Sequence, residues 1–183
     1  TVFLPTYLTE WFEQLLSVPG PEIGRVTIFS GETMMFDAEK VNFTTGDYEL
    51  RYVDPTYQRE GLVAEDNQIR GFAQAVVSTS FDNARDRDSL PVPADARRVQ
   101  FTTRSGLVLT VTLVTADGID WVLYDTATTA TATADAQAQA ATITARTADW
   151  AFQLPNPRII TLSRPIEQLV TVPVQTREPG VFT

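Results

Sequence analysis

Apolar and polar residues alternate along two stretches of the chain that have the same internal spacing. The first stretch begins at residues 25–29 and has its third strand candidate at 47–52. The second begins at 98–102 and has the corresponding segment at 120–125; 98 − 25 and 120 − 47 both give 73. Alternation with a period of two is typical of strands that bury one face. The pattern predicts a duplicated three-strand meander, arranged as two small sheets.

A stretch with helical spacing follows each meander. In residues 64–78 the apolar positions Ile69, Phe72 and Val76 lie on one helix face, and in residues 133–147 a run of alanines surrounds Ile143. We therefore predict an α+β protein of two similar units, each an antiparallel β-meander plus a covering helix. The predicted division is a first unit at 22–96, a second at 97–170 and a tail at 171–183.

The N-terminal residues 1–21 are predicted to hold an amphipathic helix and a linker. Leu8, Trp11, Phe12, Leu15 and Leu16 share one helix face, and the Pro-Gly-Pro sequence of residues 19–21 ends it. The simplest interpretation is a helix packed on the core. The alternatives are a continuation of a membrane anchor and a surface that docks on a partner.

Four segments give weaker predictions. Residues 37–45 are ambiguous, although Val41 and Phe43 favour a strand. Residues 81–96 are predicted as a charged connection and 126–133 as a mobile loop. Residues 159–170 are predicted as short helical turns that break at Pro165.

Composition excludes several classes of function. The net charge of −9 over 183 residues disfavours nucleic acid as a partner, because phosphates require a basic surface. The chain contains no cysteine and no histidine, which excludes disulfides, thiolate nucleophiles, Ser-His pairs and the commonest transition-metal ligands. We expect no cofactor and no catalytic activity.

Carboxylates are the remaining route to catalysis. Glu49 with Asp120, and Glu65 with Asp66, are the pairs that a glycosidase-like reaction could use, but any acidic chain supplies such pairs. A carboxylate-only hydrolase is therefore the weakest alternative.

The densest acidic group is formed by Asp82, Asp86 and Asp88. A calcium loop needs a glycine at its turn and a distal glutamate, and both are missing here. We interpret this group as a solvated turn whose charges pair internally.

Aromatic residues supply the candidate contact sites. Trp11, Trp121 and Trp150 each lie in an apolar pattern, which favours core packing, although a ligand or sugar pocket is the alternative. Tyr57 lies in a polar loop and is expected to be exposed, at least in part. The candidate ligand or partner contacts are Trp121, Trp150 and Tyr57.

The chain also resembles a bacterial family known as domain of unknown function number 4340. The resemblance covers most of the sequence and is carried by residues 25–28, 47–51, 72–77, 80–86, 106–111, 120–123, 145–146, 149–155 and 166–169. It implies an extracytoplasmic domain behind an N-terminal membrane helix, often encoded beside ABC-type transporter components of the gliding-motility kind. It implies no catalytic residues.

These observations lead to one expected function and two alternatives. We expect a non-enzymatic, periplasmic or otherwise extracytoplasmic scaffold or accessory domain of a membrane complex, whose protein partners are transporter-like subunits. An N-terminal anchor absent from these residues would attach it to the membrane, and exposed edge strands would be its docking surfaces. The alternatives are a small-ligand or glycan-binding module and a structural subunit of a larger envelope assembly.

Overall fold

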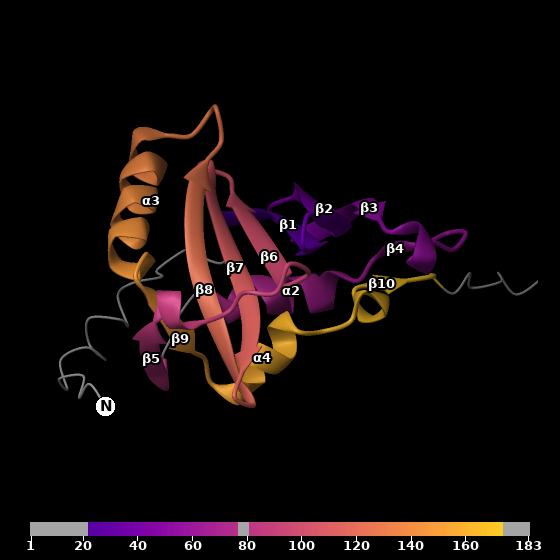
Figure 1. Cartoon of the computed structure of the whole chain (residues 1–183). Coiled ribbons are helices and arrows are strands. Elements are labelled where there is room, and N and C mark those ends of the chain that lie inside the picture. Colours follow the sequence, from indigo (N-terminus) through magenta and orange to yellow (C-terminus); the bar gives the residue numbers. More distant parts are fainter. Residues whose placement is uncertain (1–21, 77–80, 174–183) are drawn as a thin grey trace, which may run out of the picture.

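The computed structural model describes residues 22–76 and 81–173, which form an α+β structure (Figure 1). The strands of its large antiparallel sheet are β1 (Ile23–Ser30), β2 (Thr33–Asn42), β3 (Asp47–Val53), β5 (Asn83–Asp86), β6 (Arg97–Thr103), β7 (Leu107–Ala116), β8 (Ile119–Thr128) and β9 (Trp150–Gln153). A small second sheet pairs β4 (Val63–Ala64) with β10 (Val170–Thr171). The helices are α2 (Asp66–Ala75), α3 (Ala134–Thr147) and α4 (Asn156–Leu162), with 3-10 turns η2 (Pro55–Tyr57), η3 (Arg87–Ser89) and η4 (Ile166–Gln168). The predicted α+β class is confirmed.

The large sheet has the strand order β3-β2-β1-β6-β7-β8-β9-β5. It therefore contains two meanders, β1–β2–β3 and β6–β7–β8, which meet where β1 pairs antiparallel with β6. The sequence predicted two small sheets. The structure has one large sheet instead, because β1 and β6 bond to each other along residues 25–30 and 97–102.

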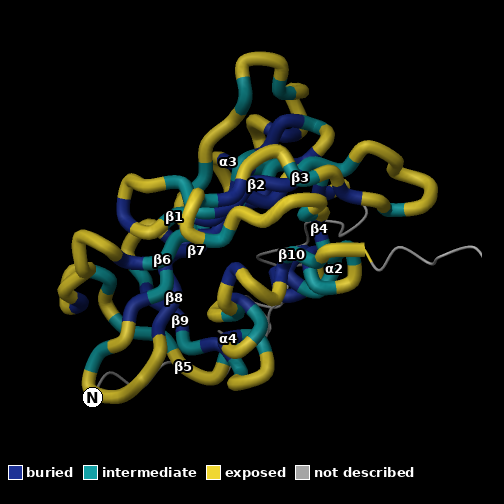
Figure 2. Tube along the Cα trace, turned by 90° about the vertical axis from the view of Figure 1, so that its right-hand side faces the viewer, coloured by how far each residue is buried: buried dark blue, intermediate teal, exposed yellow. Residues whose placement is uncertain are grey.

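The main hydrophobic core lies between one face of this sheet and the helices (Figure 2). Alternate residues of the central strands point into it, among them Val26, Val99 and Leu109, all nearly inaccessible to solvent. Ile69 of α2 and Ile143 of α3 close it from the helix side. The predicted helix faces are thus buried as expected. The opposite face of the sheet carries charged and polar residues together with a small second hydrophobic cluster.

Tight turns set the register of the second meander. Asp117 and Gly118 connect β7 to β8 with φ values of 55° and 74°, a two-residue hairpin loop that favours Asp-Gly. Gly106 precedes β7 with φ of +94°, and a side chain there would begin 2.5 Å from the hydroxyl oxygen of Thr129. Short turns thus connect β6 to β7 and β7 to β8.

Some strands extend beyond their predicted limits. β2 runs on to Asn42 through the ambiguous segment, because the carboxylate of Asp37 is satisfied inside the sheet by Arg25 and Thr27. β8 extends to Thr128, into the predicted mobile loop, where the Thr126 hydroxyl donates to the carbonyl of Ala140 in α3.

Two further segments gain pairing that the sequence did not predict. The expected connection at 81–96 contains β5, which pairs with β9 across residues 83–86 and 150–153. Thr171, placed in the predicted tail, pairs with Val63 of β4. Both are contacts between residues more than 60 positions apart, which no local pattern reveals.

The predicted N-terminal helix, with Trp11, lies outside the described residues. No helix in the part of the chain that the structure describes is long and apolar enough to cross a bilayer.

Candidate functional site

Trp121 is part of a small second core. Its side chain is buried against Leu90, Val114 and Leu123, on the sheet face opposite the helices. The guanidinium of Arg85 lies 5.2 Å from the centre of its ring, and its indole Nε1 has no hydrogen-bond partner among the described residues. The Arg85 side chain covers the ring of Trp121, so in this structure Trp121 is a core residue and does not present its ring to a ligand.

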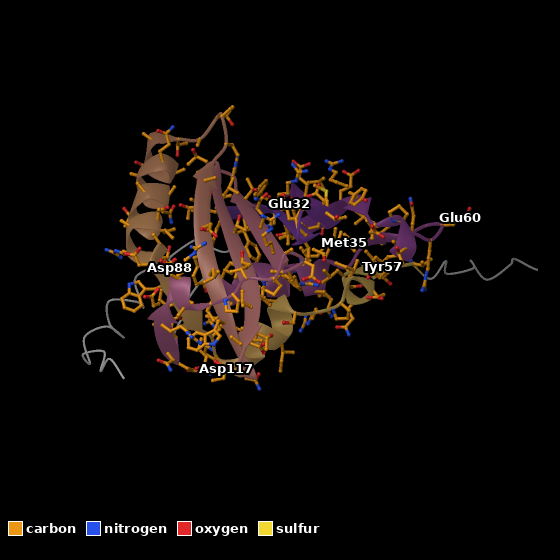
Figure 3. The ribbon with its side chains drawn as sticks, viewed as in Figure 1. Glu32, Met35, Tyr57, Glu60, Asp88 and Asp117 are labelled. Carbon is orange, nitrogen blue, oxygen red and sulfur yellow. The ribbon has the colours of Figure 1, made fainter. Side chains whose placement is uncertain are left out.

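Trp150 lies on β9, the strand next to the β8 of Trp121, whereas Tyr57 follows β3 at the other end of the strand order. Trp150 is half-buried on β9 against the main core. Tyr57, in η2 after β3, is half-buried and helps to line a cavity of about 230 Å³ with Arg59, Glu167 and Val170 (Figure 3). The structure does not bring the three aromatic candidates together. Trp121 and Trp150 are on neighbouring strands but pack into different cores, and Tyr57 lies at the other end of the strand order.

The carboxylate pairs have no catalytic arrangement. Glu49 is on β3 and Asp120 on β8, five strand positions apart, or about 24 Å at the usual spacing between strands. Glycosidase carboxylates lie about 5–9.5 Å apart. Asp66 is already engaged, since its carboxylate accepts the backbone N–H of Tyr48 at 2.7 Å.

The acidic group at residues 82–88 spans strand β5 and the start of the capped turn η3, and the internal charge pairing predicted for it is wrong. Asp86 accepts the backbone N–H of Asp88 at 2.9 Å, and Arg85 and Arg87 bind carboxylates elsewhere, at Asp117 and Asp125. Within residues 22–76 and 81–173, no three His, Cys, Asp or Glu side chains are placed to hold a metal ion.

The sheet face turned away from the helices gathers charged residues of both signs, and we call it the ionic face. All six ion pairs found within the described part of the chain involve arginines on this face. They join Arg25 to Asp37, Arg51 to Glu39 and Glu49, Arg85 to Asp117, Arg87 to Asp125, and Arg98 to Glu32. On a chain of net charge −9, this face is locally close to neutral.

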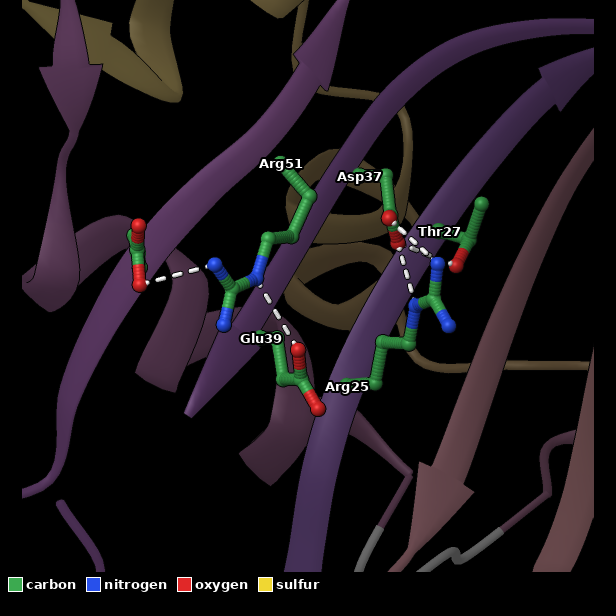
Figure 4. A network of polar contacts seen from close by, with 6 residues as sticks. Arg25, Thr27, Asp37, Glu39 and Arg51 are labelled. Carbon is green, nitrogen blue, oxygen red and sulfur yellow. Dashed lines mark hydrogen bonds and ion pairs between the residues drawn. The ribbon is translucent and has the colours of Figure 1, made fainter. Parts of the chain in front are cut away.

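The most buried carboxylate of the ionic face is Asp37 (Figure 4). Its side chain is 3% exposed and accepts hydrogen bonds from Arg25 Nε at 2.8 Å, Arg25 Nη2 at 2.6 Å and the Thr27 hydroxyl at 2.8 Å. The bonds to Asp37 raise the pKa of Arg25. On the neighbouring strand β3, Arg51 bridges Glu39 and Glu49, each at 2.9 Å and in solvent.

A cleft opens at the other side of the ionic face, between the sheet and the loop at residues 92–96. Its volume is about 400 Å³, within the range of small-ligand sites. We call it the threonine cleft; its polar lining is Glu32, Arg87, Arg98, Thr110, Thr112 and Asp125. Arg87 binds both oxygens of Asp125, at 2.9 and 3.0 Å, and Arg98 binds the carbonyl of Gly31.

Each outer strand of the large sheet has one backbone N–H that donates to a side chain. On β3 the N–H of Tyr48 donates to Asp66, and the ladder with β2 has two irregularities. On β5 the N–H of Ala84 donates to the Asn83 side chain at 2.9 Å. Such caps hinder the addition of another strand. The edge docking expected from the sequence stays a prediction, and a groove of about 610 Å³ runs beside β3.

Sequence reasoning missed the ionic face and the threonine cleft. One signal was present: Arg25 and Arg98 begin the two equivalent strands of the repeated pattern, opposite the apolar positions. The cleft itself had no signal, because its lining comes from the β1–β2 turn, η3, β6, β7 and β8. Comparisons with protein-family models, with curated proteins and with solved structures found no match for this chain.

Proposed function

We propose that this chain is a non-enzymatic binding domain that acts through protein–protein contacts, as an extracytoplasmic scaffold or accessory part of a membrane complex. The observation that carries the proposal is the ionic face, a sheet surface that none of the described helices α2, α3 and α4 covers and that holds five arginines and their carboxylate partners. Polar, charge-mixed surfaces are typical of non-obligate contacts, in which complementary charges set specificity. The membrane complex, the transporter-like partners and the N-terminal anchor rest on the family resemblance.

The partner that fits this face is a protein surface that also carries both signs of charge. Arg51 and its two carboxylate partners are 41–55% exposed, so their ion pairs are weak and can exchange with those of a partner. A strongly basic partner would place like charge against the arginines of the ionic face, and a strongly acidic partner would place like charge against its carboxylates.

Two related units remain our proposal for the origin of the sheet. Its support is the pairing of β1 with β6: residues that are equivalent under the 73-residue offset pair symmetrically about Thr27 and Gln100. Arg25 lies opposite Thr102 and Phe29 opposite Arg98, as a local two-fold relation between two copies of one strand requires. The unit boundaries at 22–96 and 97–170 and the N-terminal helix belong to the same proposal.

Site-specific photo-cross-linking in source membranes tests the protein contact. A benzophenone amino acid replaces Glu49 on the ionic face of the full-length protein, and in a matched control it replaces Ile160, an exposed residue of α4. We expect a defined membrane-protein adduct at position 49 that is lost on Arg51→Glu. Equal adducts at both positions, or none at position 49, would refute the proposal.

A further inference from the structure

The threonine cleft contains a guanidinium that is fixed before any ligand arrives. Arg98 donates from Nε at 3.1 Å and from Nη2 at 2.5 Å to the carbonyl of Gly31, and its charged group lies 5.6 Å from the centre of the Phe29 ring. No described residue hydrogen-bonds to its Nη1. An arginine held in this way loses little conformational freedom when it binds an anion.

The charge partner of Arg98 is easily displaced. Glu32 lies 2.9 Å from Arg98 Nη2, but its side chain is 94% exposed, at the tip of the turn between β1 and β2. Ion pairs in such positions contribute about 0–1 kcal/mol. A carboxylate inside the cleft would be better shielded from water, and so would bind Arg98 more strongly than Glu32 does.

The charges in the cleft leave room for one anion. Arg87 is neutralised by Asp125, through two bonds. When Glu32 turns to solvent, Arg98 is the remaining uncompensated charge of the lining. The Thr110 hydroxyl accepts a hydrogen bond from Gln100 Nε2 at 3.3 Å, so its own proton is free to be donated to a bound oxygen.

We propose that the threonine cleft binds a carboxylate group, with Arg98 as its cation, Thr110 and Thr112 as hydroxyl donors, and Glu32 as the group that the ligand displaces. The carboxylate belongs to a small organic acid or to the end of a peptide, since both offer the same chemistry. The cleft lies on the ionic face, but its binding of a carboxylate can be measured on the isolated chain, separately from the proposed protein contact.

The test is a titration of the ¹⁵N-labelled protein at constant ionic strength. The probes are succinate and its neutral diamide, and one pentapeptide with a free or an amidated C-terminus. We expect saturable shifts of the Gly31, Thr110 and Thr112 amides with the acids and not with the neutral forms. Tighter binding of succinate would identify a small organic acid as the ligand. Tighter binding of the peptide would identify the C-terminus of a peptide or protein.

Variants separate the roles. Glu32→Gln should tighten binding about two- to fivefold, because it removes the competing carboxylate. Arg98→Gln should weaken it at least about tenfold, while Arg51→Gln, on the same face but outside the cleft, should leave it unchanged. If Arg98→Gln does not fold, Thr112→Val is the second variant, and it should weaken carboxylate binding about threefold or more. Equal shifts with charged and neutral probes, or weaker binding by Glu32→Gln, would overturn the proposal.

Discussion

The buried carboxylate of Asp37 makes a sharp prediction about stability. In Arg25→Met, the Asp37 side chain stays 3% exposed but retains only the Thr27 hydroxyl of its present side-chain partners. Removing one partner of a buried ion pair costs about 3–5 kcal/mol. The Arg25 side chain is itself 47% exposed, so the pair is partly solvated, and we expect a loss of about 2–3 kcal/mol.

Removing the other partner of the ion pair, Asp37, should lower the free energy of unfolding by less. In Asp37→Val, Arg25 turns into solvent, and a β-branched residue suits the strand. The main cost is the buried Thr27 hydroxyl, which loses its acceptor, about 1 kcal/mol. Arg51→Met is the matched control, because its pairs are exposed, and it should cost about 0–1 kcal/mol.

Urea unfolding at pH 7, followed by tryptophan fluorescence, measures the three variants together. Arg25→Met should lower the midpoint by about 1 M, with the slope unchanged. The reasoning fails if Arg25→Met is no more destabilising than Arg51→Met, or if Asp37→Val costs more than Arg25→Met.

Three further predictions follow from the backbone and from buried groups. Gly106→Ala should lower the stability measured by thermal unfolding by about 2–3 kcal/mol, because the backbone has φ of +94° and the new Cβ would clash with Thr129. Gly118→Ala also has a positive φ but open space around it, so it should cost about 1 kcal/mol. Burial raises the pKa of Tyr48 to about 12, so the neutral phenol stabilises the fold below pH 10, and this stability falls as the pH rises from 10 to 12. Tyr48→Phe should flatten that fall in alkaline unfolding curves, and an unchanged slope would contradict the assignment. Asp66→Ala frees the Tyr48 N–H at the sheet edge and should increase self-association in sedimentation velocity; a strictly monomeric variant would show that the cap is not needed.

The second meander was predictable because its signals are local. β6, β7 and β8 alternate cleanly, and the Asp117–Gly118 turn fixes the register of one hairpin. The helices α2 and α3 were likewise visible in their spacing. By contrast, β2 contains a buried Asp37 whose partner Arg25 is 12 residues away, so its pattern read as ambiguous.

The candidate site was not predictable in the same way. The aromatic candidates were chosen by residue type, and Trp121 turned out to fill a second core beneath Arg85. The ionic face and the threonine cleft depend on pairings such as Gln100 with Thr110 across two strands, and on η3 lying over β8. Charge alone cannot reveal such arrangements, because an arginine on a strand gives no sign of which carboxylate it will meet.

The pairing of β1 with β6 also sets the order of events while the chain is being made. Thr27 and Gln100 are 73 residues apart (100 − 27), so β1 leaves the ribosome long before its partner. At about 5–20 residues per second, this delay lasts about 4–15 s. Throughout that interval the β1 edge of the first hairpin lacks its β6 neighbour, and an unpaired strand edge of this kind favours aggregation of the nascent chain.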